Sequence, residues 1–539
     1  MKLRALAHDR RVLAALLALG MLLAVRELAW SAPFHGGQRL LDFRVFWCGG
    51  QAALNGASPY VFEPLRSCEH RYGAGPLSAS PNLVMPFVLP PFDVALFAQL
   101  ARLPYARAAL VFSALSVLAL AAAIGLVARS VRAPVVLAAA GLAVSVGVPS
   151  LSLGQIVPLE LLFLSAAGCA LVRRWDGAAG VCAGLCLLEP HVGAFVAVSV
   201  AVLVPRARIA LSGSLAALAA LCALADRVAP PGVYLALLAR HARAEAGFYE
   251  QYSMTYALRS FGVPLDVALA AGALSSAVLL FGAVWLARGL AARDVRAAVA
   301  YVPAACAVFG GTFVHLTQIA LAVPAALIVF VHARDPRARR LGALAFVLLA
   351  VPWAYPVLVK QALASALLVV AVTVWYAGGA RYRTTLAAVA VLWLALVPIE
   401  NRPPPAVPVP LVTAQAPAAL ASGAWQEAVD RMAFVSPRYF ALKLPTWAGL
   451  FVLLAAMAGL RRAPQGPADA PMPASVGMRG SANVRSLSEP RARAAALCNR
   501  RLSSRRIRCT CPAENTSKLL VAWHTSTRPN PTGYRGPAT

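Results

Sequence analysis

The feature that most constrains the fold is a long series of apolar segments separated by short segments rich in arginine. A membrane-spanning helix needs about 20 mainly apolar residues. The chain is 60% hydrophobic and only 13% charged, whereas soluble domains are typically about 45–50% apolar and about 25% charged. Alternating segments of about ten residues, typical of outer-membrane strands, are absent. The sequence therefore predicts an all-α, polytopic transmembrane helical bundle of roughly 10–14 membrane helices.

The apolar pattern places the first span at 12–30 and a long first outer loop at 31–107. Within that loop, 82–103 is apolar but broken by prolines, which favours an interfacial or re-entrant helix. A full span there is the alternative, and it would reverse the side on which 129–132 lies. About fourteen crossings are expected in all; the later ones are 108–128, 133–149, 156–172, a hairpin of 177–188 and 192–204, 209–226, 266–287, 297–312, 316–332, 341–359, 363–376, 385–400 and 445–460.

The distribution of basic residues predicts the orientation of these spans. Lys and Arg are several times denser in the short segments predicted to be inside than in the long segments predicted to be outside, as the positive-inside rule requires. No convincing small-residue cleavage site follows the basic N-terminus and its first span, so we expect an uncleaved start-transfer helix. The chain is predicted to be a multi-pass protein of the inner (plasma) membrane with both termini in the cytoplasm.

The chain divides into a transmembrane domain at 1–460 and a basic tail at 461–539. The tail is rich in Pro, Ser and Arg and has no periodic apolar pattern, so it is predicted to be disordered. It contributes much of the net charge of +28, which we interpret as topology and lipid attraction, so no nucleic acid partner is expected. In the first outer loop, Cys48 and Cys68 are either disulfide-bonded or free.

Asp42 is the first candidate for catalysis, because it follows the first span in the aromatic segment Asp42–Tyr60. A lone aspartate here is commonly a solvated loop residue. The aromatic side chains of Phe43, Phe46 and Trp47 would, however, lie at the interface and lower the local dielectric. That environment raises a carboxyl pKa toward the value that a general base needs. Arg44 would pair with Asp42 or with a phosphate, or would simply face lipid headgroups.

Further polar residues fall on the same predicted outer side, each in a separate turn or loop. Gln155 begins a helix and would bind a sugar hydroxyl or cap the helix. Glu189 and His191 flank Pro190 at the tip of the predicted hairpin, where charged groups are costly unless they face water or function. His315 lies at a helix end, a place where a structural hydrogen bond is the common role. Tyr60 ends a structural turn, and Ser253 and Arg259 belong to the loop before the span at 266–287.

Motifs of soluble nucleotide-dependent or metal-dependent enzymes are absent. The sequence has no Walker loop, no glycine-rich dinucleotide turn, no His-Glu-x-x-His and no Gly-x-Ser-x-Gly elbow. Soluble nucleotide-dependent chemistry is therefore unsupported, and a donor would be expected to come from the membrane.

Several short motifs together resemble glycosyltransferase family 87, from about residue 10 to about residue 400. They are Asp42-x3-Phe46 with Gly56-x2-Pro59-Tyr60, the proline-rich segment 81–104, Gly154-Gln155, Ala179-Gly180-x3-Gly184-Leu185 before Glu189-Pro190, Ser253, and His315 before a helix with Pro324. The family consists of GT-C-class membrane enzymes, similar to polyprenol-phosphate-mannose-dependent α-mannosyltransferases. The resemblance implies a GT-C-like fold and an extracytoplasmic active site.

The same resemblance implies a polyprenyl-phosphate sugar donor and inversion at the anomeric carbon, with no cofactor and no obligatory metal. Asp42 matches the family's catalytic aspartate, which takes the proton of the acceptor hydroxyl, and His315 falls where relatives carry histidines near the donor phosphate. Two departures concern donor binding. Glu189-Pro190 stands where many relatives have Lys-Pro, and Ser80-Pro81-Asn82 stands where Tyr-Pro-Pro is usual.

The sequence thus predicts a membrane hexosyltransferase that transfers a hexose, with mannose expected, to a lipid or glycan acceptor. Asp42 is the expected base. Donor or acceptor contacts are expected from Arg44, Tyr60, Gln155, Glu189, His191, Ser253, Arg259 and His315. The alternatives are a transporter or flippase of lipid-linked saccharides, which would need charged groups near the middle of the membrane, and a degenerate family member with only a scaffold or binding role.

Overall fold

The structure is a computed structural model that describes residues 40–72, 80–143, 150–351 and 411–462, except 152, 433 and 434, together with scattered positions between 353 and 377. These residues form helices and two isolated bridges and contain no strand, so the predicted helical class is confirmed. Four helices are long and apolar enough to cross a membrane, and a further set of shorter apolar helices packs beside them. The predicted spans at 12–30 and 385–400, most of 363–376 and the tail beyond 462 lie outside the described residues.

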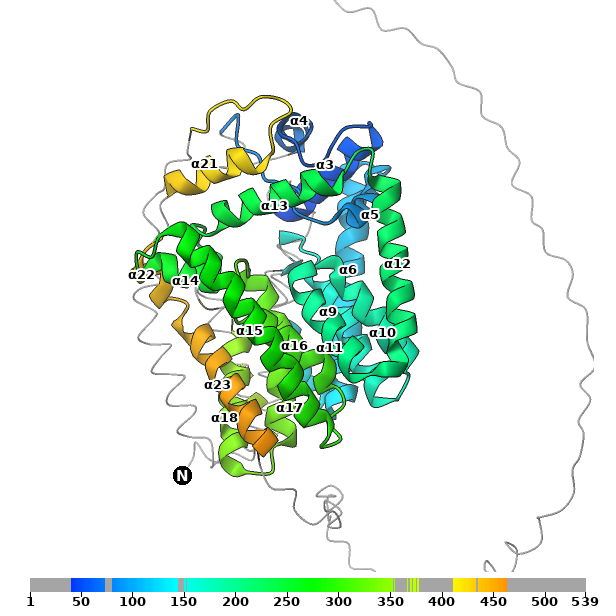
Figure 1. The fold of residues 1–539 in the computed structure, drawn as a ribbon, viewed down its shortest axis with the longest axis vertical. Helices are drawn as coiled ribbons and strands as arrows, with labels where there is room; N and C mark the ends of the chain where they lie inside the picture. Colours follow the sequence, from blue (N-terminus) through cyan, green and yellow to red (C-terminus); the bar gives the residue numbers. More distant parts are fainter. Residues whose placement is uncertain are drawn as a thin grey trace, which may run out of the picture. The chain divides into compact units, whose positions relative to one another are not determined.

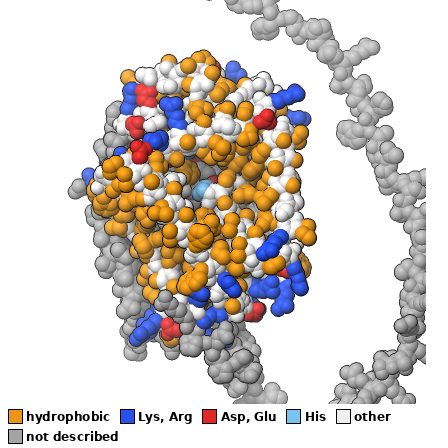
Figure 2. Space-filling model, viewed as in Figure 1, with side chains coloured by type: hydrophobic (Ala, Val, Ile, Leu, Met, Phe, Trp, Pro, Cys, Tyr) orange, Lys and Arg blue, Asp and Glu red, His pale blue; other side chains and the backbone are white. Residues whose placement is uncertain are grey.

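The four long apolar helices are α6 (Tyr105–Val131), η5 with α12 (Pro205–Ala225), α15 (Leu265–Ala291) and α23 (Leu444–Arg462) (Figure 1). On α15, apolar side chains three or four positions apart are exposed, Leu274, Val278 and Phe281 among them, and Phe281 is 77% exposed. An apolar stripe that the described helices leave exposed is what lipid contact requires. Figure 2 shows hydrophobic side chains across the middle of the visible face, with Lys and Arg side chains mainly toward its ends.

Shorter helices fill the interior between these four. They are α9 (Val157–Val172), α10 (Asp176–Leu185), η4 (Cys186–Leu188), α11 (Pro190–Leu203), α16 (Ala298–Ala307), η6 (Leu316–Ala322), α17 (Val323–His332) and α18 (Pro336–Ala350). Each coincides with a predicted span, whereas the span predicted at 133–149 is described only as the short helix α7 (Val135–Gly141). Helices α6 and α9, α10 and α12, and α17 and α18 pack in pairs.

Helices also form the first outer segment, which the sequence pattern presented as a loop. It contains α3 (Leu41–Leu54), α4 (Phe62–Tyr72) and α5 (Pro91–Ala101), and α3 packs against both of the others. Cys48 and Cys68 are disulfide-bonded and tie α3 to α4. Segment 82–103 therefore contains one short helix and no full span, as predicted.

Above the bundle lie α13 (Pro231–Glu245) and α21 (Ser422–Met432), which pack together at the same end as α3 and α4 (Figure 1). The chain before α21 crosses to the first outer segment, where the N–H of Phe62 donates to the carbonyl of Ala419. Two short helices, α14 (Met254–Ser260) and α22 (Pro437–Ala441), complete this layer. The helices α3, α4, α13, α14, α21 and α22 come from distant parts of the chain and thus form one cover over the bundle.

Basic residues of the predicted inner segments meet at one end of the helices. Arg296 pairs with Asp176 at 3.6 Å, and the guanidinium of Arg461 lies 3.3 Å from the ring centre of Trp285. His332 Nε2, at the end of α17, lies 3.0 Å from the carbonyl oxygen of Val131 at the end of α6. The segments that were assigned to one side of the membrane therefore do share one end of the structure.

Candidate functional site

A cavity of about 520 Å³ lies beneath the cover formed by α3, α13 and α21. One face of α13 lines it through Tyr234, Leu238, His241 and Glu245, which follow the helical repeat. A histidine side chain is visible in the hollow in Figure 2. The ionisable carboxyl and imidazole groups that line the cavity are Asp42, Glu189, Glu245, Glu250, His191, His241 and His315.

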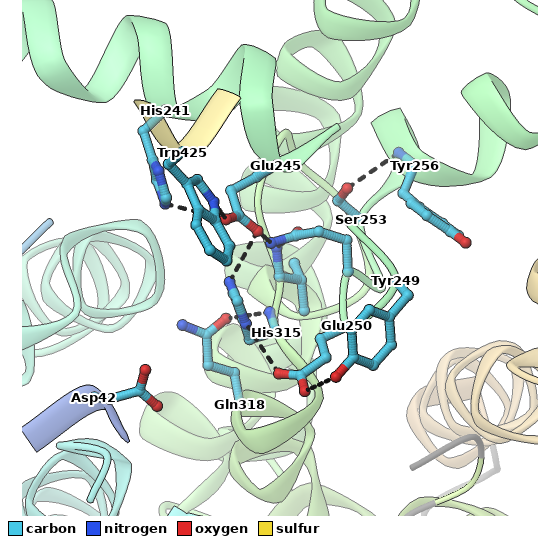
Figure 3. Close-up of polar contacts among 12 residues, drawn as sticks. Asp42, His241, Glu245, Tyr249, Glu250, Ser253, Tyr256, His315, Gln318 and Trp425 are labelled. Carbon is cyan, nitrogen blue, oxygen red and sulfur yellow. Dashed lines mark hydrogen bonds and ion pairs between the residues drawn. The ribbon is translucent and has the colours of Figure 1, made fainter. Parts of the chain in front are cut away.

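Asp42 lies in the first turn of α3 and points into the cavity (Figure 3). Gln155 Nε2 donates a hydrogen bond of 2.6 Å to Asp42 Oδ2. Burial, together with the charge of Glu250, raises the pKa of Asp42 to about 7, although His315 and the Gln155 hydrogen bond oppose the shift. A carboxyl group that titrates near neutral pH is suited to accept a proton from a hydroxyl.

Gly154 sets the distance between Gln155 and α3. Its φ is +73°, and a Cβ at this position would lie 2.6 Å from the Cβ of Phe43. Gly154→Ala is expected to lower the free energy of unfolding by about 1–2 kcal/mol from the left-handed backbone alone, with a further loss from the contact with α3. Thermal unfolding of the purified protein measures this change.

Gly213→Ala is the matched control, because nothing lies within 4 Å of the added Cβ and alanine favours a helix interior. Its midpoint is expected to stay at the wild-type value or rise slightly. A Gly154→Ala midpoint equal to that of wild type would contradict the close approach.

His315 lies across the cavity from Asp42, and it is close to two carboxylates (Figure 3). Its Nε2 lies 3.3 Å from Glu245 Oε2, and its Nδ1 lies 4.0 Å from Glu250 Oε2. Burial lowers the pKa of His315, but the hydrogen bond to Glu245 and the charges of Glu245, Glu250 and Asp42 outweigh it and raise the pKa above the ordinary value. The neighbouring carboxylates therefore favour the protonated form of His315.

Glu245 is the anchor of this group. Its carboxylate accepts hydrogen bonds from Trp425 Nε1 at 2.6 Å and Gln251 Nε2 at 2.7 Å, and His241 Nε2 lies 3.7 Å away. Burial opposes ionisation, but the charges of His241 and His315 and the hydrogen bonds from His315 and Trp425 lower the pKa of Glu245 to about 2. The carboxylate thus stays charged and holds His315 in its protonated form.

Gln318 connects His315 to the hairpin tip. Its Nε2 donates to Glu189 Oε2 at 3.0 Å, and its Oε1 accepts from the backbone N–H of His315 at 2.8 Å. His191 Nδ1 lies 3.7 Å from the same Glu189 oxygen. The ring of Phe313 packs between the histidines, with its centre 4.7 Å from that of His315 and 5.5 Å from that of His191.

Five of the predicted site residues meet in this cavity, as their common outer side predicted: Asp42, Gln155, Glu189, His191 and His315. The other four predicted residues, Arg44, Tyr60, Ser253 and Arg259, are not among the lining residues.

Those four make local contacts instead. Arg44 is buried, and its charge opposes the burial that raises the pKa of Glu69. The hydroxyl of Tyr60 donates to the carbonyl of Leu89 at 3.2 Å. Ser253 caps α14 by accepting from the N–H of Tyr256, and Arg259 donates to the carbonyl of Val263.

Sequence reasoning missed Glu245, Glu250, His241, Gln318 and Trp425. The spacing of His241 and Glu245 by four residues in an outer segment was a usable signal, because such a pair shares one helix face. No comparable signal marked Trp425, which lies 180 residues from its partner Glu245.

The ionisable side chains of the lining are four carboxyl groups, at Asp42, Glu189, Glu245 and Glu250, and three imidazoles, at His191, His241 and His315, apart from tyrosines. Among the described residues that line the cavity there is no Lys or Arg, so within this lining His315 is the group whose positive charge acts on both Asp42 and Glu189. Within the described part of the chain, no group of three or more His, Cys, Asp or Glu side chains is arranged to hold a metal ion. The metal-independent reaction stays a prediction.

Comparison with known proteins agrees with the resemblance seen in the sequence. Residues 87–314 match the model of glycosyltransferase family 87, a region that contains Gln155, Glu189, Glu245 and Glu250 and ends one residue before His315. No curated protein and no solved structure matches the chain. Residues 87–314 are thus similar to glycosyltransferase family 87, and four of the described helices are long and apolar enough to cross a membrane.

Proposed function

We propose that the chain transfers a hexose, with mannose expected, from a polyprenyl-phosphate donor to a hydroxyl group of a lipid or glycan acceptor. The observation that carries the proposal is the opposition of two groups across one cavity. Asp42, with a pKa of about 7, lies on one side, and the imidazolium of His315 lies on the other (Figure 3).

This opposition suits a direct displacement at the anomeric carbon. Asp42 removes the proton of the acceptor hydroxyl as the new glycosidic bond forms, and the bond from the anomeric carbon to the phosphate oxygen breaks on the opposite face. The phosphate leaves with its electron pair, and His315 stabilises the added negative charge. The step inverts the anomeric carbon.

The number of cations supports a donor with one phosphate. A polyprenyl-phosphate sugar is a phosphodiester with one negative charge, which a single imidazolium can balance. A diphosphate or nucleotide donor carries at least two, and sites for such groups commonly use Arg, Lys or a metal ion. The apolar lining residues, such as Val45, Val88 and Leu238, favour a lipid-linked donor over a soluble one.

The same arrangement supports an extracytoplasmic site. The cavity lies toward the cover formed by α3, α13 and α21, whereas the predicted inner basic segments meet at the other end of the helices (Figure 1). The disulfide between Cys48 and Cys68 beside the cavity suits an oxidising compartment. These features favour a multi-pass protein of the plasma membrane with the basic termini in the cytoplasm.

The experiment compares three radiolabelled donors of the same sugar with the purified full chain and a lipid extract. We expect label to move to a new product from the polyprenyl-phosphate sugar and not from the polyprenyl-diphosphate sugar or the nucleotide sugar. Glucose and galactose donors test the choice of hexose. Transfer from the nucleotide sugar, or failure of every polyprenyl-phosphate sugar, would contradict the proposal.

A further inference from the structure

A buried lysine lies behind the site and has no place in the reaction described above. Lys443 directly precedes α23 and is 2% exposed. Its Nζ donates a hydrogen bond of 2.6 Å to the carbonyl oxygen of Gln251. The same nitrogen lies 3.3 Å from the ring centre of Tyr256 and 5.2 Å from that of Tyr252. A buried ammonium group is costly unless acceptors and aromatic faces surround it, so this environment indicates a specific role.

Gln251 connects that lysine to the cavity. Its side chain donates to Glu245 Oε2 at 2.7 Å and accepts from the backbone N–H of Val314 at 2.9 Å. Its backbone forms an isolated antiparallel bridge with His315. Gln251 is fully buried. One residue therefore fixes both the carboxylate and the backbone of the His315–Glu245 pair.

The two strand-like segments around this bridge pair through further backbone hydrogen bonds. The N–H of Tyr252 donates to the carbonyl of Val314 at 2.6 Å, and the N–H of Leu316 donates to that of Glu250 at 3.2 Å. Lys443 joins this pairing from a segment 192 residues away, on the approach to α23. It is not among the residues that line the cavity.

We propose that Lys443 is a positioning residue, which holds His315 against Glu245 and Glu250 through the backbone of Gln251. Residue 443 lies outside the matched region 87–314, so the segment before α23 completes a site whose other parts lie mostly within that region. The placement of His315 does not depend on the identity of the donor. Only the effect of Lys443 on turnover rests on the proposed function.

A positioning role and a purely electrostatic role predict opposite changes at His315. If Lys443 acted only through its charge, its removal would favour the protonated imidazole and raise the pKa of His315. If Lys443 positions the loop, its removal lets Glu245 and Glu250 move away, and burial then lowers the pKa. Whichever role Lys443 has, the same ionisable groups face His315: Asp42, Glu189, Glu245, Glu250, His191 and His241.

The test measures the reaction of His315 with diethylpyrocarbonate across a pH series, with peptide mass spectrometry on the purified full chain. Only the neutral imidazole reacts, so the rate reports the pKa. In Lys443→Met we expect the pKa of His315 to fall by about one unit or more. Arg438→Met, an exposed cation in the same segment, is the matched control and is expected to leave the pKa unchanged.

An unchanged or raised pKa in folded Lys443→Met would overturn the proposal. If that variant yields no folded protein, Lys443→Gln, which keeps an N–H donor, decides the question by the same measurement with a smaller expected fall. The labelling does not require turnover, so a wrong donor cannot be mistaken for a wrong positioning residue. Where transfer is measured, we expect kcat to fall, because a displaced His315 stabilises the leaving phosphate less well.

Discussion

Replacing Asp42 with asparagine is expected to lower kcat for sugar transfer by about 10²- to 10⁴-fold, the usual contribution of a general base. Asparagine keeps the size of the side chain and an oxygen that can accept from Gln155 Nε2, but it cannot take a proton. KM for the donor is expected to change little, because the donor phosphate lies on the side of His315. The measurement is the initial rate of label transfer at saturating donor.

Asp266→Asn provides the control for this substitution, because Asp266 is exposed and pairs with surface Arg243. Such a pair contributes little to stability, so wild-type rates are expected. The unfolding midpoint of Asp42→Asn should equal or exceed that of wild type, since the substitution removes a buried ionisable group. Equal transfer by Asp42→Asn and wild type would remove Asp42 from the role of base.

The second large effect is expected from His315 and appears in the pH dependence of kcat. Activity should rise as pH increases through about 7, where Asp42 loses its proton. It should fall again at higher pH, where His315 becomes neutral, and the raised pKa of His315 puts this limb above the ordinary imidazole range. The expected profile is a bell.

His315→Gln should lower kcat by about 10²- to 10³-fold, the usual effect of losing one stabilising group at a developing negative charge. It should also abolish the alkaline limb, while the acidic limb from Asp42 remains. His332→Gln is the matched control, because His332 contacts Val131 at the other end of the helices, and it should keep both limbs. An alkaline limb that survives in His315→Gln would show that another group carries the charge.

The class of fold and much of the site could be predicted from the sequence because each rests on a strong one-dimensional signal. The apolar segments and the arginine bias placed Gln155, Glu189 and His315 on one side of the membrane, and the structure brings them to one cavity. Pro190 marked the break at which the hairpin turns. The predicted order and orientation of the spans were sufficient to predict that these residues lie together, because each of them lies in a short connection between helices on the same side.

The rest depended on helix rotation and on contacts between distant segments. Asp42 and Arg44 both lie on α3, and two residues correspond to about 200° of rotation. Asp42 therefore faces the cavity, whereas Arg44 is not among the lining residues and its charge acts on buried Glu69. Expecting a loop there hid this difference. Trp425 and Lys443 reach the site only because the chain before α23 folds back over α13 and the loop around Gln251, which no local pattern records.

The most direct test of the central claim is a comparison of membranes that contain wild type or Asp42→Asn, each incubated with radiolabelled polyprenyl-phosphate mannose and a lipid extract. We expect label to appear in a new product with wild type and not with Asp42→Asn. Transfer by both would keep the enzyme and contradict Asp42 as the base. Absence of transfer by wild type with every polyprenyl-phosphate hexose would contradict the transferase itself.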